Sequence, residues 1–505
     1  MRSMGVDMHT EVHARFEFRR SLPIIEDIHI DLTDGERAEV KRIARRLVAE
    51  EPALCAADVF APHVTTGIGG GAAVLFEDHS GTAFSDRHLD SLLEYRSIFL
   101  VQEGDLLLIG EQRDLAFEDY CRTLLGLAQI DVDRPAEMPA APFAARCESD
   151  PRIMERLVSM ARRQRELTLI TYMGTGHVWR LAREIADRSE AVVRVASPHP
   201  RLARRVNDKL WFGYRVNELL GQQAMPSTFP AFGPSALAGH LRRLARKHDR
   251  IVIKVPGGGG SEGNLVLETV EYRELSLGEV AARLTATMTG LGWEQIYPLS
   301  ISVWESPVID SPSVQLWIPH KQDGPPIVLG IFSQIITGEA GEFVGSVPCD
   351  LPIELRYRIS REAVVLATLF QELGYFGPCS FDAVVIGNNS GSAQPHWVEC
   401  NGRWTGVSIP LMLANRVIGD WHERPFVIVQ RRGLRGKPHA SFADIRQLLG
   451  PRLFNPGTMG EGTIVLTPAR TVAGTGIHIL VLAKSVEAAK AESAVVTALL
   501  LGNPS

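Results

Sequence analysis

A lysine at the end of an apolar run, followed by four consecutive glycines, is the first feature of this sequence that could do chemistry. The run Arg250–Lys254 reads as a strand, and glycines after it let backbone N–H groups converge on phosphate oxygens. The pattern is not a Walker loop, because no Gly-Lys-Ser/Thr closes it and no helix follows. A hairpin turn is the alternative, but four glycines cost more chain entropy than a turn needs. We therefore expect a phosphate site that includes Lys254, Gly258, Gly259, Gly260 and Ser261.

A set of oxygen-bearing side chains in two strand-like segments is the second feature. Side chains alternate along a strand, so we expect Glu399, Asn401 and Arg403 to share a face. Asp382 can join them from a neighbouring antiparallel strand. Two carboxylates and an amide oxygen suit Mg²⁺ with bound phosphates, and an arginine beside them can hold a phosphate or a developing oxyanion. A solvated strand is the alternative, but among apolar strands this set is costly unless it is used.

Together these residues resemble the ATP-grasp superfamily, whose fold clamps ATP between two α+β subdomains. The segment Pro298–Val308 supports the likeness, because it reads as a strand that runs into a linker whose backbone could meet an adenine. The segment Asn207–Lys209, followed by a helix, looks like the first phosphate-binding lysine of the family. The resemblance covers about residues 97–420, and the Glu-Cys-Asn-Gly-Arg ending at Arg403 is its most specific part.

The resemblance implies a role for each matching residue. It implies that ATP and Mg²⁺, or Mn²⁺ in its place, bind together, and that the glycine loop closes over the phosphates. The ribose contact stays open between Asp310 and Ser313, and no general base can be named, since His177, His320 and His396 are candidates by type alone. The implied roles are nucleotide binding for Lys209, Lys254, Glu305 and Val308, metal binding for Asp382, Glu399 and Asn401, and catalysis for Arg403.

A finer likeness is to the peptide ligases of pheganomycin-type biosynthesis. It is carried by the run from Glu399 to Gly406 and by the C-terminal run from Thr475 to Leu482. It implies a carboxylate–amine ligase that forms an amide or peptide bond through an acyl phosphate, releasing ADP and phosphate. The acid would be an amino acid derivative and the amine an amino acid or peptide, in the biosynthesis of a peptide-like natural product.

The elements that must position these residues change character along the chain. From about residue 97 strand-like runs, Ser97–Gln102 among them, alternate with helical runs, which predicts a parallel α/β layer. The later segments read as mixed α+β, so the predicted fold class is α/β and α+β with an ATP-grasp core. The expected division is an N-terminal extension of unknown role at 1–96, a preATP-grasp α/β domain at 97–205, an ATP-grasp domain at 206–424 and a small C-terminal α+β domain at 425–505.

Other classes of protein fit less well. The glycine cluster 67–71 is followed by a β-rich stretch rather than a helix, so it is not a dinucleotide loop, and Gly174–Gly176 reads as an ordinary turn. An oxidoreductase is therefore disfavoured. A nucleotide-binding regulatory protein without turnover and an ATP-grasp carboxylase remain the alternatives.

The composition limits the possible binding partners and the cellular compartment of the protein. The formal net charge of −6 argues against general nucleic-acid binding. The sequence has no apolar run of eighteen or more residues, so we expect no segment that spans a membrane. The six cysteines have no Cys-x-x-Cys spacing, so reduced thiols in a cytoplasm are the simplest interpretation. We expect a cytoplasmic enzyme, and a homodimer is left open.

Overall fold

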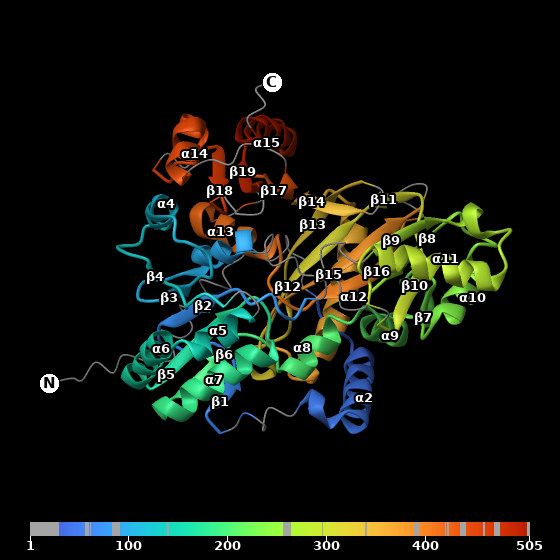
Figure 1. The fold of residues 1–505 in the computed structure, drawn as a ribbon, viewed down its shortest axis with the longest axis horizontal. Helices are drawn as coiled ribbons and strands as arrows, with labels where there is room; N and C mark the ends of the chain where they lie inside the picture. Colours follow the sequence, from blue (N-terminus) through green and yellow to red (C-terminus); the bar gives the residue numbers. More distant parts are fainter. Residues whose placement is uncertain are drawn as a thin grey trace.

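The computed structural model arranges the described chain around three β-sheets (Figure 1). It describes residues 30–55, 60, 62–82, 91–138, 141–255, 264–294, 296–338, 341–387, 393–419, 421, 424–434, 441–457, 460–468 and 475–501. The glycine run and Ser261, which we expect to contact phosphate, lie outside these residues.

The first sheet is parallel and has the strand order β1-β6-β5-β2-β3-β4. Its middle strands β2 and β5 are almost wholly buried, and β2 is apolar throughout, as expected for a sheet covered on both faces. The chain leaves β2 towards β3 but leaves β5 towards β6, so the connections diverge between these two neighbours. A crevice for ligands is expected at the carboxyl ends of such a strand pair. The strands are β1 (Val64–Thr66), β2 (Ala73–Phe76), β3 (Leu106–Leu108), β4 (Asp131–Asp133), β5 (Glu166–Thr171) and β6 (Val192–Val195).

Two of these strands come from before residue 97, within the segment that we expected to be a separate extension. We propose that residues 62–82 belong to the α/β layer. The run Ser97–Gln102, expected to be a strand, instead overlaps the 3-10 segment η3 (Ser91–Leu100). The helices of this part are α2 (Asp34–Glu50), η1 (Pro52–Leu54), α4 (Leu115–Leu125), α5 (Phe143–Ser149), α6 (Pro151–Gln164) and α7 (Gly176–Ser189).

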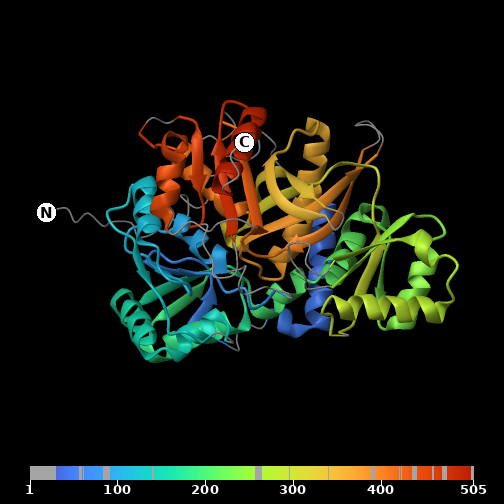
Figure 2. The ribbon, with the colours of Figure 1, turned by 45° about the horizontal axis from the view of Figure 1, so that its top comes forward.

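The second sheet is antiparallel, has the order β7-β10-β8-β9, and forms a separate yellow-green lobe with helices α10 and α11 (Figure 2). Two consecutive helices lead into this lobe from the first sheet, and a turn at Asn207 and Asp208 separates them. The elements are α8 (Pro200–Val206), α9 (Lys209–Leu220), η4 (Gln222–Ala224), β7 (Thr228–Ala231), α10 (Pro234–Leu244), β8 (Arg250–Lys254), β9 (Asn264–Glu268), η5 (Thr269–Tyr272), α11 (Leu277–Gly290) and β10 (Leu299–Val303).

The third sheet has nine strands in the order β11-β15-β12-β13-β14-β17-β19-β18, with β16 paired to β15. Its last three strands come from the segment that we expected to be a small domain of its own. They join the sheet where β14 pairs with β17, and Gly345 permits this contact because a Cβ there would lie 2.2 Å from the Ile428 carbonyl oxygen. The strands are β11 (Val308–Asp310), β12 (Pro312–Ile318), β13 (Ile327–Thr337), β14 (Glu342–Pro348), β15 (Gly377–Ile386), β16 (Gln394–Asn401), β17 (Phe426–Leu434), β18 (Gly462–Val465) and β19 (Thr475–Leu482).

The helices around the third sheet complete the fold. The longest of them, α12, buries its apolar side against β12 and β13 and packs against α2 on its other side. In the described ranges, no helix is both long enough and apolar enough to cross a bilayer. These helices are η6 (Lys321–Asp323), α12 (Ile353–Glu372), α13 (Ser408–Ile418), α14 (Phe442–Leu449), η9 (Gly450–Arg452) and α15 (Val486–Leu500).

A carboxyl group in η3 should make the stability of the first sheet depend on pH. Burial raises the pKa of Glu94 to about 7, against the hydrogen bond from the Gly110 N–H at 2.5 Å. Between pH 4.5 and 7 the folded protein holds this proton and the unfolded chain releases it, so the free energy of unfolding falls as pH rises through this window. Glu94→Gln removes the charge and keeps an oxygen for Gly110. Its Tm relative to wild type should therefore rise by about 2–4 °C between pH 5 and pH 8 by calorimetry, and a constant difference would contradict this.

Candidate active site

A cavity of about 500 Å³ lies between the second sheet and the third. Strands β8 and β10 contribute one wall, β15 and β16 the other, and the linker between β10 and β11 closes one end. Most of the residues expected to bind nucleotide or metal line this single cavity, although they lie far apart in the sequence. They are Lys209, Lys254, Glu305, Val308, Asp382 and Glu399.

The two carboxylates face each other across a strand pair. Asp382 on β15 lies opposite Glu399 on β16, with a register irregularity directly after this pair. The Ser313 hydroxyl donates to Asp382 Oδ1 at 2.6 Å, and the Asn401 amide nitrogen donates to Oδ2 at 3.0 Å. The amide oxygen of Asn401 therefore remains an available acceptor beside the carboxylates.

The two carboxyl groups differ in pKa, and their mutual repulsion favours the binding of a cation. Burial alone would raise the pKa of Glu399, but Lys209, whose Nζ lies 2.9 Å from Glu399 Oε2, and Lys254 outweigh it and lower this pKa. Burial and the neighbouring charge of Glu399 raise the pKa of Asp382. A divalent ion would offset this repulsion.

The donor set also fits the cation chemically. Carboxylate and amide oxygens are hard ligands, which Mg²⁺ prefers, and phosphate oxygens usually complete its shell. In the part of the chain that the structure describes, no three His, Cys, Asp or Glu side chains gather into a metal-binding group. Asn401 and a bound phosphate would therefore have to supply the remaining oxygens.

Two lysines bring positive charge to the same carboxylates from different elements. Lys209 is the first residue of α9, and Asp208 fixes this helix end by accepting hydrogen bonds from the backbone N–H groups of Leu210 and Trp211. Lys254 ends β8, where burial lowers its pKa while Glu399 raises it. Both ammonium groups can therefore reach phosphates held in the cavity.

The linker end of the cavity has its own fixed contacts. Glu305 Oε1 lies 2.9 Å from His396 Nδ1, and the Arg250 guanidinium lies 5.5 Å from the centre of the Trp304 ring. Asp310 lines the cavity, whereas Ser313 donates its hydroxyl to Asp382. Of the two ribose candidates, Asp310 is thus the better placed.

Arg403 lies beyond the end of β16, so strand alternation does not set its direction. Its Nε donates to the Tyr172 hydroxyl at 2.8 Å, and its Nη1 donates to Asn207 Oδ1 at 2.6 Å. Tyr172 directly follows β5, and its carbonyl accepts a hydrogen bond from the Trp404 N–H. Arg403 therefore sits where the first sheet meets the third.

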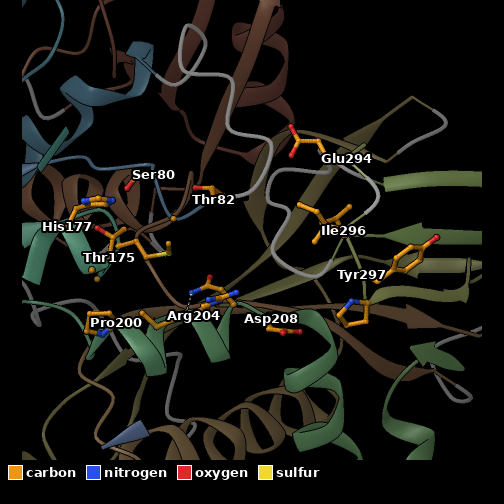
Figure 3. A pocket seen from close by; sticks show the side chains of 18 of the residues that line it. Ser80, Thr82, Thr175, His177, Pro200, Arg204, Asp208, Glu294, Ile296 and Tyr297 are labelled. Carbon is orange, nitrogen blue, oxygen red and sulfur yellow. Dashed lines mark hydrogen bonds between the residues drawn. The ribbon is translucent and has the colours of Figure 1, made fainter. Parts of the chain in front are cut away.

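A second cavity, of about 880 Å³, opens at the carboxyl ends of β2 and β5 (Figure 3). Polar side chains from the first sheet line one side, and Glu294, Ile296 and Tyr297 from the second lobe line the other. Asn207 and Asp208 line it as well, so the residue that holds Arg403 and the residue that caps the Lys209 helix both border this cavity. The first-sheet and α8 side chains labelled in the view are Ser80, Thr82, Thr175, His177, Pro200 and Arg204.

The three histidines considered from the sequence have different surroundings. His396 pairs with Glu305 at the nucleotide cavity, and His177 lines the second cavity beside Arg180. His320 stacks on Phe376, and burial lowers its pKa.

The polar run Glu77–His79, directly after the buried strand β2, was missed by sequence reasoning. The Arg96 guanidinium donates to Glu77 at 2.7 Å, and the His79 ring lies 4.1 Å from the Tyr172 ring, centre to centre. Three consecutive polar residues after an apolar strand were the available signal.

Comparisons with known proteins agree with this architecture. Residues 94–186 match the Pre ATP-grasp domain family. Among solved structures, the ADP complex of an N5-carboxyaminoimidazole ribonucleotide synthetase is similar, with 12% identity and a TM-score of 0.51 over 86% of this chain and 97% of that one. The Staphylococcus aureus N5-carboxyaminoimidazole synthetase complexed with ADP has 8% identity and a TM-score of 0.50 over 84% and 97%.

No curated protein sequence matches the chain. The likeness to pheganomycin-type ligases therefore stays a prediction. The fold is supported separately, by the comparison with solved structures. Residues 94–186 thus match the Pre ATP-grasp domain, and most of the chain shares the mixed α/β fold of the two synthetases complexed with ADP.

Proposed function

We propose that this chain is an ATP-dependent carboxylate–amine ligase that forms an amide or peptide bond through an acyl phosphate. The observation that carries the proposal is the gathering of Lys209, Lys254, Asp382 and Glu399 around one cavity between two sheets. Phosphoryl transfer requires mainly positioning and charge neutralisation, and this set supplies both. Arg403, which donates a hydrogen bond to Asn207 in the lining of the second cavity, adds a cation where a second substrate could meet the phosphate.

ATP would lie along the first cavity with its adenine at the linker from Glu305 to Val308 and its ribose near Asp310. Lys209 and Lys254 would hold the phosphates, and Asp382, Glu399 and Asn401 would hold Mg²⁺. The bound ion would neutralise phosphate charge during transfer. The substrate carboxylate would attack the γ-phosphorus, and ADP would leave.

The acid and the amine would occupy the second cavity, whose volume is in the range of small-molecule sites. Arg204 offers a cation on its floor and Glu294 an anion on its far wall, which suits zwitterionic substrates such as amino acid derivatives and peptides. Arg403 would stabilise the tetrahedral oxyanion formed when the amine attacks. A role in making a peptide-like natural product is consistent with these substrates.

Phosphorus NMR with ATP, Mg²⁺ and panels of amino acid derivatives and amines tests the proposal. The expected products are ADP and phosphate, because the two lysines and the metal ligands would together neutralise charge on the terminal phosphate. The acid alone with hydroxylamine should yield a hydroxamate, which traps the acyl phosphate. Asp382→Asn serves as the inactive control.

Other outcomes would identify other functions. Pyrophosphate release that tracks amide formation would overturn the phosphoryl-transfer assignment. ADP release that depends on bicarbonate would indicate a carboxylase. Tight ATP binding without turnover in any mixture would indicate a regulatory nucleotide-binding protein.

A further inference from the structure

We propose that His79, held by Glu77, is the general base that takes the proton from the attacking amine; this inference rests on the ligase function proposed above. The amine nitrogen forms a bond to the acyl carbon, and the carbon–oxygen bond to phosphate breaks. The N–H proton passes to the imidazole, and phosphate leaves with the electron pair of the broken bond. No oxidant or further reactant is needed.

The loop after β2 holds His79 in place from both sides. Glu77 accepts hydrogen bonds from Arg96 at 2.7 Å and from Ser97 at 3.3 Å. Asp78 accepts hydrogen bonds from the backbone N–H groups of Ala144 at 3.0 Å and Ser80 at 2.9 Å. The Thr82 N–H and hydroxyl both donate to the His79 carbonyl at 3.0 Å. A base that is already fixed in this way loses little orientational freedom when it reacts.

The pairing with Glu77 selects the tautomer that a base requires. His79 Nε2 lies 3.0 Å from Glu77 Oε2, and the Arg96 ion pair keeps Glu77 an acceptor. Nε2 therefore carries the hydrogen, and Nδ1 presents its lone pair. Among the residues that the structure describes, Nδ1 has no hydrogen-bond partner. A carboxylate that orients an imidazole also stabilises the imidazolium formed on proton transfer.

The location brings this base close to the expected oxyanion donor. The His79 and Tyr172 ring centres are 4.1 Å apart, and the Tyr172 hydroxyl accepts the Arg403 hydrogen bond at 2.8 Å. The next residue, Ser80, lines the second cavity (Figure 3). The histidine side chain keeps 11% of its surface exposed, so the ring is neither sealed in the core nor freely solvated.

Charged and titratable side chains surround His79. They come from three parts of the fold: η3, the ends of β2 and β5, and the segment after β16. The groups are Glu77, Glu94, Arg96, Tyr172 and Arg403.

The test separates the two half-reactions, using hydroxylamine and the acid and amine found in the product screen. His79→Gln should form hydroxamate within about twofold of wild type, because hydroxylamine is a strong nucleophile without a base. The variant should lose amide formation by about 10²–10⁴-fold, the usual contribution of a general base. His63→Gln, at an exposed position before β1, is the matched control and should leave both rates unchanged.

Chemical rescue distinguishes a base from a structural histidine. Added imidazole should restore part of the amide formation of His79→Ala, and 4-methylimidazole, a stronger base, should restore more. Nitrogen-15 NMR of the wild-type imidazoles, assigned with His79→Gln, should show hydrogen on Nε2 of His79 in the free protein.

Equal loss of hydroxamate and amide in His79→Gln would overturn the inference, as would full amide formation or hydrogen on Nδ1. Absence of rescue in a variant with a wild-type Tm would overturn it too. Failure of the wild-type protein to form any hydroxamate would instead contradict the ligase function itself.

Discussion

Replacing Glu399 by glutamine should lower ATP turnover by about 10²–10³-fold while leaving the fold intact. Glu399 pairs with Lys209 at 2.9 Å and lies opposite Asp382 in the strand register. Removing one partner of a buried charged set costs about 3–5 kcal/mol, and 1.4 kcal/mol corresponds to a tenfold change in rate. The same substitution takes an anionic ligand from the proposed metal site, so a higher Mg²⁺ concentration should recover part of the rate.

ADP release at a series of Mg²⁺ concentrations, together with circular dichroism, measures this effect. Asn401→Ala should act in the same direction, because it removes the amide oxygen and the hydrogen bond to Asp382. Glu354→Gln, at an exposed position on α12, is the matched control. Near-wild-type ADP production by either site variant, with a normal spectrum, would contradict the metal assignment.

The pairing of the acidic residues shows what a sequence pattern can predict. Alternation along β16 and an antiparallel neighbour were enough to bring Asp382 and Glu399 together, because strand geometry repeats every two residues. The direction of Arg403 could not follow from the same rule, since the strand ends at Asn401. Its contacts with Tyr172 and Asn207 come from distant segments, which no local period reports.

Short elements were the other source of error. The apolar run Ile98–Val101 looks like a strand, but a short buried run has no clear period and here lies in and just after a 3-10 segment. Strands β1 and β2 span only a few residues each, and their place in the first sheet depends on parallel pairing with β6 and β5. Parallel partners lie far apart in sequence, so the sequence gives no local sign of them.

The second cavity depends most on tertiary structure. Ser80, Thr175 and Tyr297 come from three segments, and only the packing of the lobe against the first sheet brings them to one space. No local pattern in the sequence joins these three residues. The sequence indicated a turn at Gly174–Gly176, but not that this turn lies where the connections of the neighbouring strands β2 and β5 diverge.

Replacing Arg403 should affect the second half of the proposed reaction more than nucleotide binding. The side chain is half-buried and makes two directed hydrogen bonds, to the Tyr172 hydroxyl at 2.8 Å and to Asn207 at 2.6 Å. A lysine cannot reproduce this planar, forked geometry, so Arg403→Lys is not a conservative change. Removing a donor to a developing oxyanion typically costs about 10²–10³-fold in kcat.

Rapid-quench measurements of acyl phosphate and amide, with ATP affinity from calorimetry, test whether amide formation falls more than ATP affinity. Arg403→Lys should lower amide formation by about 10²–10³-fold and change ATP affinity by less than about threefold. Tyr172→Phe keeps the ring but removes the hydroxyl acceptor, so it should lower amide formation by only about tenfold, the value of one hydrogen bond to a charged group. Because both variants retain Lys209, Lys254 and the carboxylates, phosphate transfer should stay close to wild type. If ATP affinity falls as far as amide formation, Arg403 is a phosphate ligand of the nucleotide and not a stabiliser of the oxyanion.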